Sequence, residues 1–504
     1  MTYSLFRRSL SKISTSTNSN LLLSRLNLIN YSAITVTQNN IQNNVRCKSY
    51  VASNRMKGGI PKLKSSVTEK TAIERIKEMQ KLTPTSLSVQ ELLSFPQQTN
   101  PEERSFIFLR KQLLIRLANI IFEIECLPKA FRQQPSFAQC QEWYWQSFKD
   151  ILRFEEVDAR DITNQQEFTA CLQKVVNRHS TVVETMAHAV LEYKHYSNYE
   201  SPNNNREFRR ELTKFLDRFF MSRIGIRLLI NQHLALFSSS MDNMESSHQL
   251  DTYKVGAFDR CMNVKTVIED AYYDAQYLCE KNYFDYDCPE LELISNNCTN
   301  LFGESAFEIG YVPSHLHHIC FEVFKNAQRA SIENAIKLNK ADAEPIKVSI
   351  TVGETEISIK IEDRGGGASN QTARNWFDYL YTTASDPTKN QESNQDGTTT
   401  SIVERAAANN DNQPTNFQVG DAPMAGYGVG LPISRLYARY LSGELQVIPT
   451  EGLGTLVVLY LKRNSEQAKE VLPNYVTRLK DVYESSQKNK ASTWLGDGDN
   501  YFSS

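Results

Sequence analysis

The residues from His315 to Ala330 constrain the fold of this chain more than any other stretch, because they combine a helical pattern with chemically active side chains. The stretch contains no glycine or proline and is predicted to be a helix. His318, Glu322 and Asn326 recur at intervals of four, so a helix aligns them in one row on one face. Taken alone, such a row is more often a solvated surface than a chemical site. The segments that follow decide between these two interpretations.

Two strands and three glycine clusters follow that helix. Alternating apolar residues predict strands at 348–352 and 357–361. Glycine permits positive φ and lets a ligand approach the backbone, and a glycine loop that opens a helix directs its amides at an anion. One cluster alone usually marks a turn, but three in this order behind a Glu-x-x-x-Asn helix predict a ligand site. The clusters are Gly365 to Gly367, after Asp363; Gly426 to Gly430, before a helix predicted through Tyr440; and Gly452 to Gly454, between strands predicted at 445–448 and 456–461.

These four segments resemble the N, G1, G2 and G3 boxes of the ATPase fold shared by gyrase, Hsp90, histidine kinases and MutL. Two stretches are more specific: FEVFKNAQRA at 321–330 and GLPISRLYARY at 430–440. They are similar to the mitochondrial protein kinases that phosphorylate 2-oxo-acid dehydrogenase complexes, above all the pyruvate dehydrogenase kinases. The resemblance runs from about Leu82 to Lys462. It implies that ATP lies between a mixed sheet and helices, under a mobile lid.

The resemblance implies a role for each residue of the helical row. Glu322 is implied to be the general base for the substrate serine hydroxyl. Asn326 is implied to supply an oxygen ligand to Mg²⁺, which suits a hard ion. His318 is predicted to hydrogen-bond Glu322 and tune its pKa, the alternative being a partly buried structural histidine. The implied cofactors are ATP and Mg²⁺, with K⁺ as a further candidate.

The other ATP contacts follow from the same resemblance. Asp363 is implied to accept a hydrogen bond from the exocyclic amine of adenine, with the base against Gly365 and Gly367. Lys325 and Arg329 are implied to meet the phosphates or the lid. The further implied ATP-binding positions are Val323, Phe324, Ala327, Gln328, Thr382, Thr383, Gly426, Tyr427, Gly428, Val429, Gly430, Leu431 and Thr455.

Two positions depart from the family pattern, because Gln328 stands where Met is usual and Leu456 where Asp is common. Neither departure removes a catalytic group.

The fold alone does not dictate kinase activity, and three other kinds of protein could share it. An ATP-driven clamp would carry further domains after the ATPase. A histidine kinase would need a phosphoacceptor histidine, followed by Glu or Asp, on its own helical hairpin, and neither His179-Ser180 nor His233-Leu234 fits. A silent scaffold is disfavoured by the intact Glu322, Asn326 and Asp363.

Composition places the chain among ordinary globular proteins. Its 504 residues predict two to three domains, and the formal net charge of -2 shows no overall basic excess of the kind that suggests nucleic acid. No apolar run approaches the ~18 residues that a membrane span needs. The nine cysteines are scattered without metal-binding spacing, which predicts reduced thiols in a reducing compartment.

The first 68 residues differ from the rest of the chain. No acidic residue precedes Glu69, while arginines and lysines are interspersed with Ser, Asn and Leu. This composition predicts a mitochondrial transit peptide and disordered leader over 1–68, and hence the mitochondrial matrix. The alternative is a disordered polar tail.

Helical periodicity dominates from Leu82 onwards. Four long helices are predicted: one from Asn100 to Leu127, a second near 136–154, a third from about 164 to 193 and a fourth from 205 towards 237. They predict a four-helix bundle over 80–250, the alternative being helices packed into the nucleotide domain. An α/β sandwich ATP-binding domain should occupy 251–463, with a helix at 264–283. The fold class is therefore predicted to be α+β.

Two polar stretches fall in or after the ATP-binding domain. The interval 384–425, rich in Asn, Gln, Thr and Ser, lies where the family has its lid and is predicted to be disordered. The tail at 464–504 contains Trp494, where the related kinases commonly have an Asp-Trp pair that reaches a partner subunit. A homodimer is implied by the family, and the tail leaves its crossing to the partner open.

The resemblance also implies regulation and partners. In this family the helical domain docks the lipoyl domain of the E2 acyltransferase and senses small 2-oxo acids. Arg223 and Arg227, with His179 on another helix, are predicted to converge on a carboxylate, the alternative being surface salt bridges. The implied substrate is a serine of the pyruvate dehydrogenase E1α subunit, with the branched-chain 2-oxo-acid dehydrogenase complex as the alternative.

Overall fold

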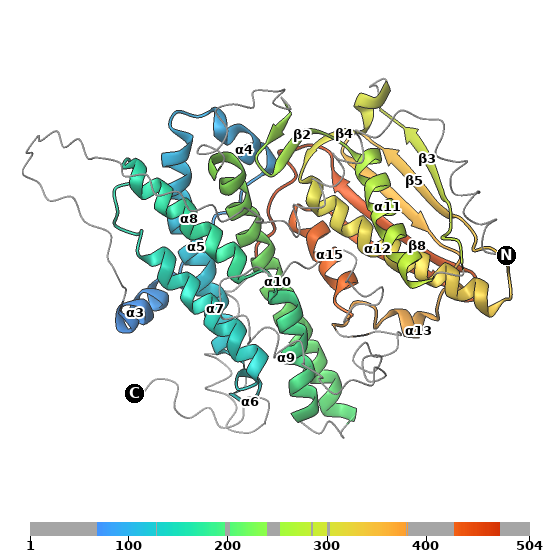
Figure 1. Cartoon of the computed structure of the whole chain (residues 1–504), viewed down its shortest axis with the longest axis horizontal. Helices are drawn as coiled ribbons and strands as arrows, with labels where there is room; N and C mark the ends of the chain where they lie inside the picture. The colour runs from blue at the N-terminus through green and yellow to red at the C-terminus, as the bar shows by residue number, and fades with distance from the viewer. Residues whose placement is uncertain are drawn as a thin grey trace, which may run out of the picture. The chain divides into compact units, whose positions relative to one another are not determined.

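The computed structural model describes residues 68–127, 129–196, 202–238, 253–283, 286–299, 303–379, 381 and 428–473. A helical region is followed by a mixed α/β region, so the predicted α+β class is confirmed (Figure 1). Within the described ranges no helix is both long and apolar enough to cross a membrane. The leader up to residue 67, the predicted lid at 384–425 and the tail beyond 473 lie outside the described residues.

The long helices of the first region pack through apolar stripes. Helix α5 contacts α7 and α10, while α7 also contacts α9, and α10 contacts α8. Large aromatic side chains from these helices, such as Phe106, Phe168 and Phe219, are fully or almost fully buried between them. The elements are α3 (Glu69–Met79), α4 (Val89–Ser94), η1 (Phe95–Gln97), α5 (Pro101–Glu125), α6 (Lys129–Arg132), α7 (Pro135–Leu152), α8 (Ile162–Arg178), α9 (Val182–Tyr196) and α10 (Pro202–Phe237).

One predicted helix is in fact two. The chain leaves the helical conformation at His179, which follows α8 with φ -92° and ψ 12°, and resumes it at Val182 in α9. A single helix from about 164 to 193 was therefore the wrong prediction. The apolar period continues across the break, but Ser180 and Thr181 fall between the helices, and such hydroxyl residues favour caps and turns over helix interiors.

The second region is built on a five-stranded sheet in the order β3-β5-β6-β8-β7. Only β3 and β5 are parallel, and the other neighbours are antiparallel. The predicted period-2 strands are confirmed: Ile350 pairs with Ile359, which pairs with Leu459, and all three are buried. The strands are β3 (Leu291–Asn297), β5 (Ile346–Val352), β6 (Glu356–Glu362), β7 (Glu444–Thr450) and β8 (Gly454–Lys462).

Three helices complete the region that carries the predicted site. Helix α12 contacts both α11 and α15, and Figure 1 shows α11 and α12 lying across one face of the sheet. The helices predicted at 264–283 and 315–330 are present, the second longer than predicted. The remaining elements are β1 (Lys254–Val255), β2 (Phe258–Asn263), α11 (Val264–Asn282), η3 (Gly303–Phe307), β4 (Glu308–Tyr311), α12 (Pro313–Lys337), α13 (Asn370–Ala373) and α15 (Gly430–Tyr440).

Candidate active site

The polar row on α12 centres on an ion pair. The Lys325 ammonium lies 2.8 Å from Glu322 Oε1, and the two side chains are only 10% and 14% exposed. Asn326, the next residue, is exposed. The row therefore offers a shielded carboxylate beside an accessible carboxamide.

Glu322 is held in its ionised form. Burial raises the pKa of Glu322, but the charge of Lys325, then the field of His318 and the hydrogen bond from Lys325, lower it by more, so the pKa lies below its ordinary value. At neutral pH this side chain is a carboxylate, which is the form that can accept a proton.

The first turn of α15 closes against that carboxylate. A Cβ built on Gly430 would lie 2.1 Å from Glu322 Oε2, so only glycine fits at this position without moving the carboxylate. Gly430 is the first residue of α15, where unpaired backbone amides and the helix dipole favour negative charge. Gly430 of the glycine loop and Glu322 of the polar row are far apart in the sequence, and the fold brings them into contact.

His318 does not pair with Glu322 as predicted. Its Nε2 is buried without a hydrogen-bond partner among the described residues, and its ring lies 4.8 Å from that of Tyr437 on α15. Burial lowers the pKa of His318, with Glu322 opposing that shift. Lys325, which sequence reasoning assigned to phosphates or the lid, holds the carboxylate instead.

Asp363 occupies the junction of β6 and β8. Its Oδ1 accepts hydrogen bonds from the Gly365 amide at 2.9 Å and the Thr455 amide at 3.2 Å. The side chain is buried, and burial raises its pKa to about 6 although both amides oppose the shift. Two of the predicted glycine segments therefore fix one carboxyl group.

Comparison with known proteins identifies this arrangement. The family model "Mitochondrial branched-chain alpha-ketoacid dehydrogenase kinase" matches residues 86–257, and "Histidine kinase-, DNA gyrase B-, and HSP90-like ATPase" matches residues 311–465. Pyruvate dehydrogenase (acetyl-transferring) kinase isozyme 4 of Mus musculus is 36% identical over 431 residues, 85% of this chain and 93% of that protein. The corresponding kinase of Ascaris suum is 40% identical over 397 residues, 78% and 87%, and human isozyme 3 is 37% identical over 401 residues, 79% and 88%. This chain belongs to the mitochondrial 2-oxo-acid dehydrogenase kinase family.

The other positions predicted for ATP in this family member lie in different surroundings. Val323, Phe324 and Ala327 lie on the buried side of α12 and pack in the core, and Gln328 is fully buried, with Nε2 donating to the Tyr272 carbonyl at 3.4 Å. Arg329 lies 3.5 Å from Glu333. Gly428, Val429 and Leu431 surround the start of α15. Thr382, Thr383, Gly426 and Tyr427 lie outside the described residues.

Two predicted glycines serve the packing of the protein against itself. A Cβ on Gly365 would lie 2.4 Å from Ala330 Cβ on α12, and one on Gly367 would lie 2.1 Å from the Thr450 carbonyl oxygen. Gly367 also has a φ of +60°, which side chains rarely adopt. Both residues let the loop after β6 lie close to its neighbours.

The three residues predicted to bind an effector lie close together. Arg223 Nη2 donates to the His179 carbonyl and Arg227 Nη1 to the Val176 carbonyl, both at 3.1 Å. Within the described ranges neither guanidinium has a carboxylate ion-pair partner. Burial, reinforced by Arg223, lowers the pKa of Arg227 to about 10. The alternative prediction, surface salt bridges, requires carboxylate partners for Arg223 and Arg227. Their arrangement therefore fits an anion site better.

Sequence reasoning missed the residues that hold the His179 ring. Ser147 Oγ lies 2.9 Å from His179 Nε2, the Trp143 carbonyl lies 3.3 Å from it, and the Tyr144 ring lies 4.5 Å away. All three come from one stretch of α7. No motif marks them, because their spacing is that of any amphipathic helix.

The ion pair on α12 predicts a measurable shift. In Lys325→Met, burial of Glu322 is opposed only by weaker neighbours, so its pKa should rise above the ordinary value for glutamate. Carboxyl ¹³C titration with labelled glutamate measures this, and Glu322→Gln assigns the resonance. Lys337→Met, at the exposed end of the same helix, is the matched control and should leave Glu322 unchanged. An unshifted Glu322 in Lys325→Met would mean that another group holds its charge.

Proposed function

We propose that this chain is a protein serine kinase of the mitochondrial matrix that transfers the γ-phosphate of ATP to a serine of the pyruvate dehydrogenase E1α subunit, thereby inactivating the complex. The observation that carries the proposal is the ionised Glu322, held beside Asn326 and against the first turn of α15 in a nucleotide-binding fold. The curated relatives described above are all pyruvate dehydrogenase kinases by name, which supports this substrate.

Phosphoryl transfer needs a positioned nucleophile and charge stabilisation more than covalent chemistry. Glu322 is assigned as the base that accepts the serine proton, because it is charged and shielded from solvent. Lys325 keeps Glu322 charged. If the Lys325 ammonium moved away or bound a second anion, the pKa of Glu322 would rise and the carboxylate would become a stronger base. His318 is assigned a tuning role through space, since its ring is buried one turn before the carboxylate.

Asn326 fits a Mg²⁺ ligand, because its exposed amide oxygen is a hard donor beside the carboxylate row. Mg²⁺, when bound, neutralises phosphate charge. Asp363 fits adenine: two amides occupy Oδ1, which leaves Oδ2 to accept from the exocyclic amine. K⁺ stays a prediction to which no residue is assigned.

The partners are proposed on the same basis. The helical region predicted at 80–250 would dock the lipoyl domain of the E2 acyltransferase, and the kinase would act as a homodimer. The ATP-binding domain is proposed to span 251–463, with its lid at 384–425. The second candidate substrate is the branched-chain complex, which is favoured by the name of the family model that matches residues 86–257.

A parallel phosphorylation assay separates the two substrates. Purified pyruvate and branched-chain dehydrogenase complexes are each incubated with the full chain and ATP-Mg²⁺ labelled at the γ-phosphate. Label should enter the E1α serine of the pyruvate complex faster, with loss of that complex's activity. Preferential label in the branched-chain E1α would reverse the assignment.

Substitutions in the α12 row should impair phosphate transfer and ATP binding to different extents. Glu322→Gln preserves size but removes the base, so phosphate transfer should fall by ~10²–10⁴-fold with ATP affinity nearly intact. Asn326→Ala removes the metal ligand, so ATP binding and transfer should fall together. His318→Ala should cause a milder loss with a displaced pH profile. Calorimetry measures ATP binding and ³²P incorporation measures transfer. Near-normal transfer by Glu322→Gln would leave positioning and electrostatics as the source of catalysis.

The arginine pair predicts inhibition by small 2-oxo acids. Removing a charge-assisted hydrogen bond should raise the concentration of pyruvate or dichloroacetate needed for half-inhibition by roughly tenfold or more in Arg223→Ala and Arg227→Ala. Arg210→Ala, an exposed position on the same helix, is the matched control and should inhibit as the wild type does. Unchanged inhibition in both pocket variants would dismiss the site.

A further inference from the structure

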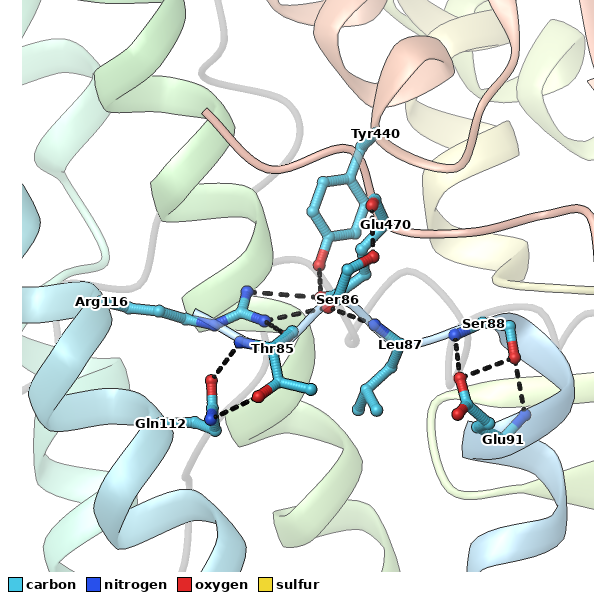
Figure 2. A network of polar contacts seen from close by, with 9 residues as sticks. All are labelled: Thr85, Ser86, Leu87, Ser88, Glu91, Gln112, Arg116, Tyr440 and Glu470. Atoms are coloured by element: carbon cyan, nitrogen blue, oxygen red, sulfur yellow. Dashed lines mark hydrogen bonds and ion pairs between the residues drawn. The ribbon is translucent and has the colours of Figure 1, made fainter. Parts of the chain in front are cut away.

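A fully buried carboxylate outside the active site joins four segments of the chain. Glu470 Oε2 lies 2.9 Å from Arg116 Nη2 on α5, and these side chains are 0% and 3% exposed. The same carboxylate accepts from the Leu87 amide at 3.0 Å and from the Tyr440 hydroxyl on α15. Figure 2 shows these groups pointing toward one another, with Arg116 also donating to the Thr85 carbonyl. We call Arg116, Tyr440 and Glu470 the Glu470 cluster.

Backbone hydrogen bonds hold the segment around Glu470 in place. The Glu470 amide donates to the Leu87 carbonyl at 2.9 Å, and the Val89 amide donates to the Ala468 carbonyl at 2.8 Å. The Val471 amide donates to the carbonyl of Tyr440 at 2.8 Å. The segments before α4 and after β8 thus run together, and the second of them is bonded to the C-terminal end of α15.

Helix α15 has its two ends at two different sites. Its last residue, Tyr440, is fully buried in the Glu470 cluster, and its first residue, Gly430, lies against Glu322. An 11-residue helix is a rigid rod of about 16 Å. Fixing Tyr440 therefore fixes the depth at which the first turn of α15 meets the catalytic carboxylate.

We propose that Glu470 is a positioning residue for phosphoryl transfer, which anchors α15 so that its first turn holds the nucleotide phosphates beside Glu322. The inference rests on the proposed function for the identity of the reaction. A buried ion pair contributes little to net stability, since desolvation offsets most of the attraction, but it fixes geometry when several donors converge on its carboxylate. Glu470 accepts four hydrogen bonds, from the Leu87 amide, two N–H groups of Arg116 and the Tyr440 hydroxyl, and these three residues lie in three parts of the chain.

Gly225 on α10 supplies an independent test of the same anchor. A Cβ at Gly225 would lie 2.5 Å from Arg116 Nη1 and 3.0 Å from the Tyr440 hydroxyl. Gly225→Ala removes no group from the Glu470 cluster, but its added methyl group would crowd the Arg116 guanidinium and the Tyr440 hydroxyl. It should affect nucleotide binding in the same direction as a change at Glu470, and less strongly.

The experiment compares ATP binding with stability in the full chain. Glu470→Gln keeps the shape but leaves Arg116 without a counter-charge, and Tyr440→Phe removes one hydroxyl and keeps the ion pair. Because the first turn of α15 would supply the amides that meet the phosphates, its displacement should weaken a charge-assisted hydrogen bond, so the ATP dissociation constant should rise roughly tenfold in Glu470→Gln and less in Tyr440→Phe. Calorimetry on folded protein at low temperature measures it. Thermal unfolding measures stability.

Glu123→Gln is the matched control. Glu123 on α5 is also buried, and its ion-pair partner, Arg218 at 3.0 Å, belongs to α10 and not to α15. It should lower the unfolding temperature without changing ATP affinity. If Glu470→Gln behaves like this control, or if Tyr440→Phe binds ATP normally where Glu470→Gln fails to fold, the proposal is overturned. ATP calorimetry needs no protein substrate, so a chain that binds ATP but phosphorylates neither E1α would refute the proposed function and leave this test valid.

Discussion

The site depends on keeping a carboxylate charged in a place that water hardly reaches. Burial alone would favour the neutral acid of Glu322, and one ammonium, three residues later on the same helix, reverses that preference. The first turn of α15 adds a positive helix end on the other side. Since both influences act over a few ångströms, α12 and α15 have to keep their relative positions. Much of the surrounding packing, including the absence of a side chain at Gly430, serves that requirement.

The elements of the fold follow from the sequence because their signals are local. Alternating Ile and Val predicted β5 and β6, and the uninterrupted helical pattern predicted α12. The break between α8 and α9 could not be predicted in the same way, because the buried side of the pattern continues through it. The start of α5 is similar: Asn100, where the helix is predicted to begin, stands at its N-cap, but with a φ of 51° and no side-chain cap hydrogen bond. Boundaries of this kind depend on tertiary contacts.

The chemistry of the site was less predictable than its location. The sequence shows that His318, Glu322 and Lys325 share a helix. It does not show which of the two neighbours contacts the Glu322 carboxylate, since that depends on side-chain rotamers, which packing against α15 restricts. Lys325 reaches the carboxylate, whereas the His318 ring packs on Tyr437. Gly365 and Gly367 are predicted to lie against the adenine base, and their surroundings add a second reason for glycine, because a Cβ would collide with Ala330 or Thr450. Family resemblance located the residues, and packing determined what each can do.

The break after α8 has a consequence for how tightly anything could bind between Arg223 and Arg227. The last carbonyls of a helix have no partners within it, and here the two arginines satisfy those of Val176 and His179. The resting pair is thus engaged by the negative end of α8. An incoming carboxylate would have to compete with these oxygens for the same N–H groups, so its gain is the difference between two similar contacts. Such an exchange favours a weakly bound, rapidly released ligand, whose occupancy changes at high rather than low ligand concentration.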